Sequence, residues 1–397
     1  MTFRITYLLA AAVLLGPLAM QIYLPILPSL ESEFGVTRQS VQLTLSLFIL
    51  ATGVSQLFSG TLSDRFGRRP VMLVGIAVFA LGSIGCAMAD SANQLIAGRI
   101  VQAMGGGTGL VIARAVLSDL YPPVEMARRL AIVIMIMLIG PMLGPLTGGY
   151  LGTLVGWRSI FWLLVGAAIA VFTLLAWRLP ETHPVYKRGE AKSMRAGFAL
   201  ALSRPRFWLY SLITTTSTAG FYLFMSVIPH LMEDRYGEPP ERLGQLFIVM
   251  AFAYGIGNFG ATRFAAALGI PRTVAAGSAG TMLGLGTLVL IELTIGLVPA
   301  TLFAAMAIVT MSQGFFGPSA NGGAVAQVPE RNGAASSLVS FSMQFFAAAL
   351  IQSFAIAPTD TVWPLLTALV IVHGVCFAAA FVANRSSAAS LATTGRP

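Results

Sequence analysis

The segment Gly60–Pro70 (GTLSDRFGRRP) places three arginines and one aspartate between two long apolar runs. Guanidinium and carboxylate groups form charge-assisted, often bidentate hydrogen bonds when they lie close together. Asp64 can accept such bonds from Arg65 or Arg68, and Asp119 is a second carboxylate expected on the same side of the membrane. This chemistry predicts an ionic cluster that holds helix ends together in one conformation and releases them in another.

We expect this conformational latch to comprise eight residues: Gly60, Asp64, Arg65, Gly67, Arg68, Arg69, Arg114 and Asp119. Glycine at 60 permits close helix approach, and glycine at 67 permits a turn with positive φ. The alternative interpretation is that the arginines serve only as an orientation signal. The ordered glycine and aspartate positions favour the latch, because an orientation signal needs only basic residues near the span ends.

A charged residue, Arg99, lies inside the apolar run at 93–116, with Gln102 one turn later on the same face. A charge inside a membrane span is costly, so such a residue is a functional-site candidate by default. Gln21 is predicted at the same depth in the first apolar run. A carboxylate there could pair with Arg99 and exchange protons, whereas glutamine hydrogen-bonds without titrating. Gln21 is therefore either a ligand contact or a buried polar group that fixes helix packing.

Other polar and aromatic residues within apolar runs suit a pocket for a lipophilic molecule, which is mostly apolar with a few placed polar groups. For any single residue, ordinary helix packing is the more common explanation. Together with Gln21, Arg99 and Gln102, the candidate substrate-binding residues are Tyr23, Tyr222, Phe224, Asn258, Gln313 and Gln344.

Glycines recur every four residues in the segment Ile139–Gly149 (IGPMLGPLTGG), at Gly140, Gly144 and Gly148. Such a stripe lets helices approach closely in lipid. Pro141 and Pro145 each remove a backbone hydrogen bond and bend the helix. The pattern predicts either a static packing seam or a helix that rocks against the other half of the protein, and both can hold.

The composition indicates a membrane protein, because 56% of the 397 residues are hydrophobic and only 10% are charged. Soluble domains carry about 25% charged residues. A membrane span needs about 20 apolar residues, and the sequence contains twelve apolar runs of about this length. We place them at 5–27, 41–59, 71–89, 93–116, 130–153, 159–177, 207–229, 243–261, 273–294, 298–317, 334–357 and 362–383.

The net charge of +9 is an orientation signal rather than a mark of nucleic-acid binding. With the N-terminus inside, most lysines and arginines fall in inner segments, and the outer loops carry Arg38, Arg158, Arg235 and Arg242. This asymmetry follows the positive-inside rule and predicts two cytoplasmic termini. We expect an N-terminal six-helix bundle at 1–179, a cytoplasmic linker at 180–205, and a C-terminal six-helix bundle with a short tail at 206–397.

The chain resembles the major facilitator superfamily over nearly its whole length. Gly60–Arg69 matches the superfamily's first-loop signature, and Gly98–Gly107 (GRIVQAMGGG) resembles its fourth-helix arginine motif. The segment Gly140–Gly149 resembles the fifth-helix signature of drug exporters. The resemblance implies twelve helices in two pseudo-symmetric bundles and alternating access.

Within the superfamily the chain is similar to the Bcr/CflA drug-resistance group and its chloramphenicol/florfenicol exporters. The similarity rests on the segments Gly16–Pro25, Val41–Pro70, Arg204–Ser211 and Ser319–Pro329. The similarity implies export of lipophilic compounds in exchange for protons, with Arg99 as a candidate proton-path or substrate partner. Relatives in that group commonly carry an acidic residue where this chain has Gln21, which bears on proton coupling.

We therefore expect a monomeric, multi-pass protein of the bacterial inner membrane that exports small amphipathic compounds or drugs by proton antiport. Its partners would be a small lipophilic or amphipathic substrate, protons and the lipid bilayer. One alternative is a metabolite exporter or facilitator without proton coupling, and a remote one is a non-transporting membrane sensor. We expect no enzymatic activity, no cofactor, no metal and no nucleic-acid partner.

Overall fold

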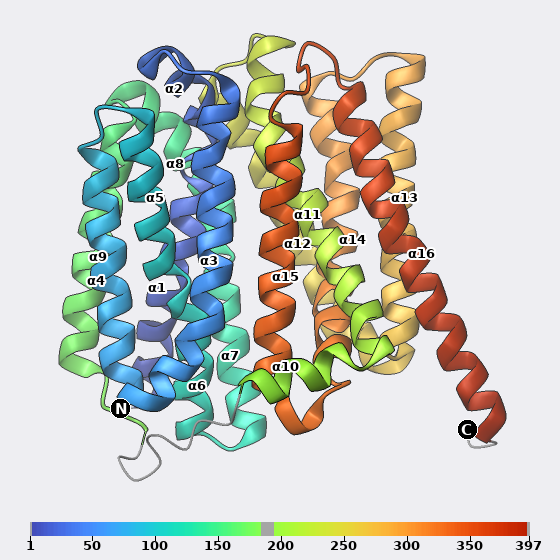
Figure 1. Cartoon of the computed structure of the whole chain (residues 1–397). Coiled ribbons are helices and arrows are strands. Elements are labelled where there is room, and N and C mark those ends of the chain that lie inside the picture. Colours follow the sequence, from blue (N-terminus) through green and yellow to red (C-terminus); the bar gives the residue numbers. More distant parts are fainter. Residues whose placement is uncertain (1, 184–193, 395–397) are drawn as a thin grey trace. The chain divides into compact units, whose positions relative to one another are not determined.

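The computed structural model of the chain describes residues 2–183 and 194–394. Within those ranges every regular element is a helix (Figure 1), so the predicted all-α class is confirmed. Three basic residues of the predicted cytoplasmic linker, Lys187, Arg188 and Lys192, lie outside the described residues.

The elements follow one another in this order: α1 (Thr2–Gln21), η1 (Leu24–Ile26), α2 (Leu27–Phe34), α3 (Arg38–Phe66), α4 (Arg68–Ala87), α5 (Ala92–Gly106), α6 (Thr108–Leu120), α7 (Pro123–Met137), α8 (Ile139–Leu154), α9 (Arg158–Arg178), α10 (Met194–Leu202), α11 (Pro205–Asp234), α12 (Pro240–Leu268), α13 (Ile270–Thr294), α14 (Pro299–Val325), η3 (Pro329–Arg331), α15 (Asn332–Phe354) and α16 (Trp363–Thr394).

The described residues contain twelve helical segments long and apolar enough to cross a membrane, which confirms the predicted number of spans. Some spans are interrupted helices. The fourth span consists of α5 and α6, which meet at Gly107, and the fifth consists of α7 and α8, which meet at Leu138. Glycine and proline near these junctions weaken the regular backbone hydrogen bonding of a helix.

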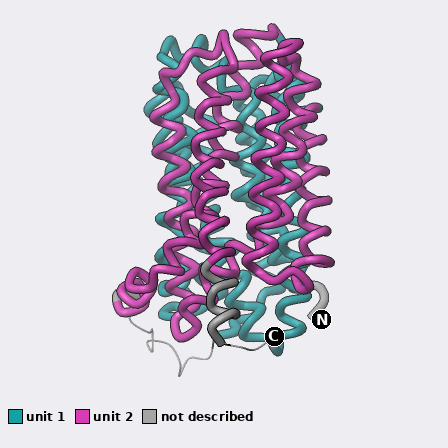
Figure 2. The backbone as a smooth tube through the Cα atoms, turned by 90° about the vertical axis from the view of Figure 1, so that its right-hand side faces the viewer, with its two compact units in different colours: residues 1–192, 238–245 teal, residues 193–237, 246–397 magenta. Residues whose placement is uncertain are grey.

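The helices group into two compact units, which Figure 2 distinguishes by colour. Unit 1 comprises Met1–Lys192 with Glu238–Gln245, and unit 2 comprises Ser193–Gly237 with Leu246–Pro397. The stretch expected to be a polar linker, 180–205, includes the helix α10, which packs against α15 of unit 2. The predicted bundle boundaries at 179 and 206 stay a prediction.

In unit 1, α4 packs against α3, α5 and α9, while α1 packs against α6, α7 and α8. The turn between α3 and α4 consists of Gly67 alone, whose φ of 102° and ψ of 155° suit glycine. This single-residue turn brings the end of α3 and the start of α4 together, and so places Asp64 next to Arg68.

In unit 2, the long helix α11 packs against α14, α15 and α16. Its N-terminal half contributes Phe207, Tyr210 and Ile213 to a buried apolar cluster with Phe316 of α14 and Cys376 of α16. Because many small residues line these helices, they approach closely enough to bury polar side chains between them.

Candidate functional site

The glycines around Arg99 determine how deeply this residue is buried. A Cβ atom on Gly82 would lie 2.2 Å from the backbone nitrogen of Gln102, and one on Gly105 would lie 2.3 Å from that of Phe79. No side chain fits at such distances, so α4 and α5 touch backbone to backbone. This seam carries Arg99 and Gln102 into the interior of unit 1, where both are 0% exposed.

Arg99 begins a directed chain of hydrogen bonds. Its Nη1 donates to the carbonyl oxygen of Ala19 at 3.0 Å and to Oε1 of Gln102 at 2.7 Å. The Gln102 amide nitrogen donates to Oγ of Ser83 at 2.8 Å, and Ser83 donates to the carbonyl oxygen of Phe79 at 2.8 Å. In this chain the Gln102 oxygen accepts and its amide nitrogen donates, which fixes the orientation of the Gln102 amide.

Two aromatic rings flank the Arg99 guanidinium. Its Cζ lies 4.5 Å from the ring centroid of Tyr23 and 4.0 Å from that of Phe48. Both distances fall within the range of cation–π attraction. The Tyr23 hydroxyl donates to Thr44 at 2.8 Å, because the Thr44 hydroxyl proton is used on the carbonyl of Val41. These contacts join the predicted residues Tyr23, Arg99 and Gln102 into one cluster.

The Arg99 charge has no carboxylate partner in the described part of the chain. Its contacts are a carbonyl, an amide and two rings, and its Nε and Nη2 atoms are buried without a hydrogen-bond partner. A guanidinium stays protonated in proteins. Unit 1 therefore holds a buried positive charge with unused donors.

Gln21, the last residue of α1, packs against α8. Its Cβ faces Gly144 of α8, where an added Cβ would lie 2.8 Å away. Gln21 is 4% exposed, and its amide forms no hydrogen bond with the described residues. Both interpretations of Gln21, as a ligand contact or as a buried polar group that fixes helix packing, stay predictions.

The glycine stripe of α8 packs on α1 within unit 1. Added Cβ atoms would lie 3.0 Å from the nitrogen of Leu18 at Gly140 and 1.8 Å from the carbonyl oxygen of Ile22 at Gly148. These contacts form a close packing seam between α8 and the C-terminal part of α1. Rocking of the stripe against the other half stays a prediction. Pro141 lies in the first turn of α8, just after the junction with α7, and Pro145 lies inside the helix.

The predicted residues of unit 2 fall into separate places. Tyr222 of α11 and Gln344 of α15 are half-buried neighbours that interact through their polar groups. Phe224 is 1% exposed and packs edge-to-face on Phe303 with centroids 5.9 Å apart, so it belongs to the apolar core. Asn258 is half-buried, and the backbone of its helix α12 touches Gly314 of α14.

Gln313 belongs to a buried network with His373 of α16. The Gln313 amide nitrogen donates to the carbonyl of Ser217 at 3.2 Å and to Nε2 of His373 at 3.0 Å. His373 is 1% exposed, and its Nδ1 donates to the carbonyl of Leu369 at 2.9 Å. Because Nε2 accepts a hydrogen bond, these partners fix His373 as the neutral Nδ1–H tautomer.

Room for the His373 ring comes from Gly220 of α11, where a Cβ would lie 2.2 Å from the ring carbon Cε1. A histidine and a glycine on different spans indicate such a contact only when it is known which helices pack together.

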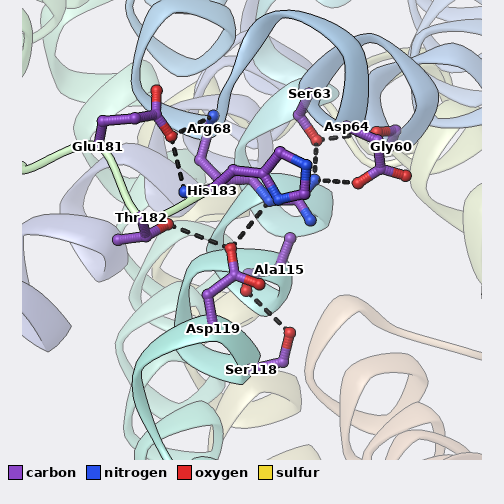
Figure 3. Close-up of polar contacts among 10 residues, drawn as sticks. All are labelled: Gly60, Ser63, Asp64, Arg68, Ala115, Ser118, Asp119, Glu181, Thr182 and His183. Atoms are coloured by element: carbon purple, nitrogen blue, oxygen red, sulfur yellow. Dashed lines mark hydrogen bonds and ion pairs between the residues drawn. The ribbon is translucent and has the colours of Figure 1, made fainter. Parts of the chain in front are cut away.

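Figure 3 shows the charge cluster at the α3–α4 turn of unit 1. Arg68, 7% exposed, donates from Nη1 to Ser63 Oγ at 2.6 Å and to Asp64, and from Nε to Asp119 Oδ2 at 3.1 Å. Its backbone nitrogen donates to Oε1 of Glu181 at 3.0 Å. One arginine thus connects the ends of α3, α4, α6 and α9.

The structure brings together only part of the predicted latch. Arg65 is exposed and lies over the ring of Phe66, 5.3 Å from its centroid. Arg69 donates from Nη2 to the carbonyl of Ala176 at 2.6 Å. A Cβ on Gly60 would meet Val111 at an ordinary 3.7 Å, so close approach does not require glycine there. Arg114 is half-buried in α6.

The sequence reasoning missed Ser63, Glu181 and Thr182 as members of this cluster. Thr182 donates to Asp119 at 3.2 Å, and the nitrogen of His183 donates to Glu181 at 2.9 Å. The available signal was the acid directly after the sixth span, in Arg178–Thr182 (RLPET). An acidic residue at a helix end is too common to be assigned a partner without the fold.

These features define a class of protein: the described residues form twelve apolar helical spans that bury polar side chains between them, with a charge cluster at helix ends. Within the described residues, no group of three or more His, Cys, Asp or Glu side chains could hold a metal ion. This combination of features is typical of a membrane transporter. The chain belongs to the Major Facilitator Superfamily, whose family model matches residues 9–351. This family consists of transporters, in agreement with the expectation that the chain is not an enzyme.

Curated relatives resemble part of the chain. It is 35% identical over 260 residues to the "Chloramphenicol resistance protein" of Pseudomonas aeruginosa, covering 63% of this chain and 61% of the relative. It is 33% identical over 243 residues to "Multidrug resistance protein D" of Escherichia coli (strain K12), covering 61% of each. A match at 31% identity to the "Uncharacterized MFS-type transporter YdgK" of Bacillus subtilis (strain 168) covers 66% of each. The chain thus matches somewhat less than two thirds of these relatives' lengths.

Solved structures share the fold. A D-xylose-proton symporter superposes with a TM-score of 0.76 at 14% identity, covering 96% of this chain and 97% of that one. A bacterial homologue of the human lysosomal transporter Spinster superposes with a TM-score of 0.74 at 18% identity, covering 96% of each. At such identities the likeness concerns the fold alone, and it confirms the predicted fold of the superfamily.

Proposed function

We propose that the protein exports small lipophilic or amphipathic compounds, including drugs, by alternating access and in exchange for protons. Membership of the superfamily and two relatives named for drug resistance support this proposal. The observation that carries it is the buried Arg99 cluster, since a fully buried charge with unused donors is costly unless it serves a cargo or ion pathway. Tyr23 and Gln102 would orient that charge.

The remaining substrate contacts of this proposal are Gln21 in unit 1 and Tyr222, Asn258 and Gln344 in unit 2. Unpartnered or half-buried amides and hydroxyls among apolar residues provide the few placed polar groups that a lipophilic ligand needs. Gln313 would act indirectly, because its hydrogen bond to His373 holds α14 to α16. Phe224 would also act indirectly, because it packs in the apolar core of unit 2.

The charge cluster around Arg68 would act as the conformational latch. Its contacts join four helix ends, so a small displacement of any one of them breaks several charge-assisted hydrogen bonds at once. The bundles predicted at 1–179 and 206–397 would be the moving parts, connected by the linker at 180–205.

The cellular setting that fits this function is the bacterial inner membrane, with a monomer whose two termini face the cytoplasm. The distribution of lysine and arginine between alternate connections supports this orientation. The cluster around Arg68 would then lie at the cytoplasmic surface.

A second candidate function is export or facilitated passage of a native metabolite without proton coupling. One observation favours it: in the described spans every carboxylate lies in the first or last turn, and His373 is fixed as a neutral tautomer. Proton antiport normally needs a group that changes protonation as access alternates.

Everted membrane vesicles or proteoliposomes separate these candidates. The full chain would be tested with a panel of uncharged, anionic and cationic amphiphiles, with and without an imposed pH gradient. Antiport predicts that a gradient drives accumulation and that a protonophore abolishes it. Passage that ignores the gradient supports the second candidate, and absence of movement for the whole panel contradicts transport of this class.

A further inference from the structure

Three exposed arginines lie at one end of the helices of unit 2. Arg206 is in the first turn of α11, Arg272 is in the first turn of α13, and Arg385 ends the twelfth span in α16. Each lies within two residues of a member of the same buried apolar cluster, namely Phe207, Val274 and Ala383. The three guanidinium groups are therefore placed at the same end of that cluster, the end that faces the cytoplasm in the orientation proposed above.

This end of unit 2 carries almost no negative charge. Within the described residues, the three guanidinium groups form no hydrogen bond or ion pair. The carboxylate of Glu330 lies at this end, and it is already paired with Nη2 of Arg204 at 3.1 Å. The other carboxylates of unit 2 belong to the opposite helix ends: Glu233, Asp234, Glu292 and Asp360.

The cytoplasmic helix ends of unit 1 are different, because carboxylates lie among their arginines. Arg68 contacts Asp64 and Asp119, and Arg129 pairs with Glu125 at 2.8 Å. An orientation signal requires only basic residues near the span ends, so it does not explain why acids accompany the arginines in one unit and not in the other. The arginines of unit 2 are available to a negatively charged partner from outside the chain.

A large exposed apolar side chain accompanies each of the three arginines. Trp208 is 50% exposed, Ile270 38% and Phe381 44%. The Cζ of Arg385 lies 4.4 Å from the ring centroid of Phe381, so guanidinium and ring form one surface. Aromatic and basic side chains at a span end are typical of the depth where lipid headgroups meet acyl chains. The partner that fits this surface has a negative headgroup and an apolar tail.

We propose that Arg206, Arg272 and Arg385 bind the phosphate groups of anionic phospholipids in the inner leaflet. The planar guanidinium fork matches phosphate oxygens, and each exposed apolar neighbour contacts the upper part of an acyl chain. The proposal rests on the orientation stated under the proposed function. It depends neither on the identity of the cargo nor on proton coupling.

The test is a lipid titration of the full chain in neutral detergent, followed by the melting temperature. Dioleoyl phosphatidylglycerol is the anionic probe, and dioleoyl phosphatidylcholine is the zwitterionic comparison. Phosphatidylglycerol should raise the Tm at concentrations where phosphatidylcholine does not. Equal effects of the two lipids would overturn the proposal, and so would an equal rise with inorganic phosphate alone, because the site would then take a free anion.

Charge variants locate the binding. A basic residue near an anionic membrane surface strengthens binding roughly fivefold, so Arg272→Gln with Arg385→Gln should raise the lipid concentration at half-maximal shift roughly 25-fold. Arg272→Lys with Arg385→Lys should retain most of the binding, because an ammonium also attracts phosphate. An unchanged titration of the glutamine variant would refute the assignment. The single variant Arg385→Gln, expected to bind roughly fivefold more weakly, replaces the double variant if that one does not fold.

The matched control is Arg128→Gln with Arg242→Gln, which removes the same charge from exposed positions of unit 1. Each of these arginines has an acid close by in the sequence, Glu125 and Glu241. The control should titrate like the wild type, and a loss as large as that of the Arg272 and Arg385 variant would show a general charge effect and overturn the proposal. Because the titration measures lipid binding without transport, its failure leaves the proposed function standing.

Discussion

Replacing Gly148 with alanine tests the packing of α8 on α1. The new Cβ would lie 1.8 Å from the carbonyl oxygen of Ile22 and 2.7 Å from its carbonyl carbon, both of which are backbone atoms. Real Cβ contacts essentially never fall under 3.0 Å, so the two helices must separate by about 1 Å at this point. Over-packing of this kind costs about 1–3 kcal/mol, and a rigid backbone partner places the cost near 3 kcal/mol.

Alanine also gains about 1 kcal/mol in helix propensity over glycine, which leaves a net loss of about 2 kcal/mol. For a unit of this size that corresponds to a fall in Tm of about 4–8 °C. The matched control is Gly166→Ala in α9, because a Cβ there has nothing within 4 Å. This control should keep or slightly raise the Tm.

The measurement is thermal unfolding in detergent, followed by the intrinsic fluorescence of the five tryptophans, together with transport in proteoliposomes. Transport by Gly148→Ala should fall by more than the folded fraction does, because α1 carries Gln21 next to the displaced Ile22. Equal melting temperatures for the two variants would refute the backbone contact on which this reasoning depends.

Three further predictions concern the polar clusters. Arg68→Lys should lower the free energy of unfolding by about 1–3 kcal/mol and slow transport, because one ammonium cannot reach all the acceptors that the guanidinium contacts. The control Arg65→Lys, at an exposed position, should change neither. Equal effects of the two variants on Tm and transport rate would contradict this prediction. Tyr23→Phe should lower the free energy of unfolding by about 1 kcal/mol, because one hydrogen bond is lost. Tyr23→Leu should lower it by about 1 kcal/mol more, because the ring over the buried guanidinium is also lost. Identical melting curves for the two variants would argue against the cation–π contact. A double-mutant cycle of Gln313→Leu and His373→Phe should give a coupling energy of about 1 kcal/mol in thermal unfolding, and strict additivity would show that their hydrogen bond contributes nothing.

Much of the fold could be predicted from the sequence because lipid solvation constrains it strongly. A span must be about 20 apolar residues long and must satisfy its own backbone, so hydropathy reveals the number and order of spans. The same logic identified Arg99 as a candidate residue, because a charge inside a span needs an explanation. The positive φ at Gly67 could also be predicted from the local sequence, because a glycine between two helical runs suits a tight turn.

Partner choice required the tertiary structure, because it depends on how the helices are rotated and paired. Periodicity did not reveal that Gly82 and Gly105 let α4 and α5 touch, or that Gln21 faces α8 while Arg99 faces Tyr23. It likewise gave no sign that Gly220 makes room for His373, or that Glu181 completes the contacts of Arg68. The sequence by itself determined which residues are costly to bury. The three-dimensional packing decided which neighbours offset that cost, since a hydrogen bond depends on ångström-scale distances that spacing along the chain does not specify.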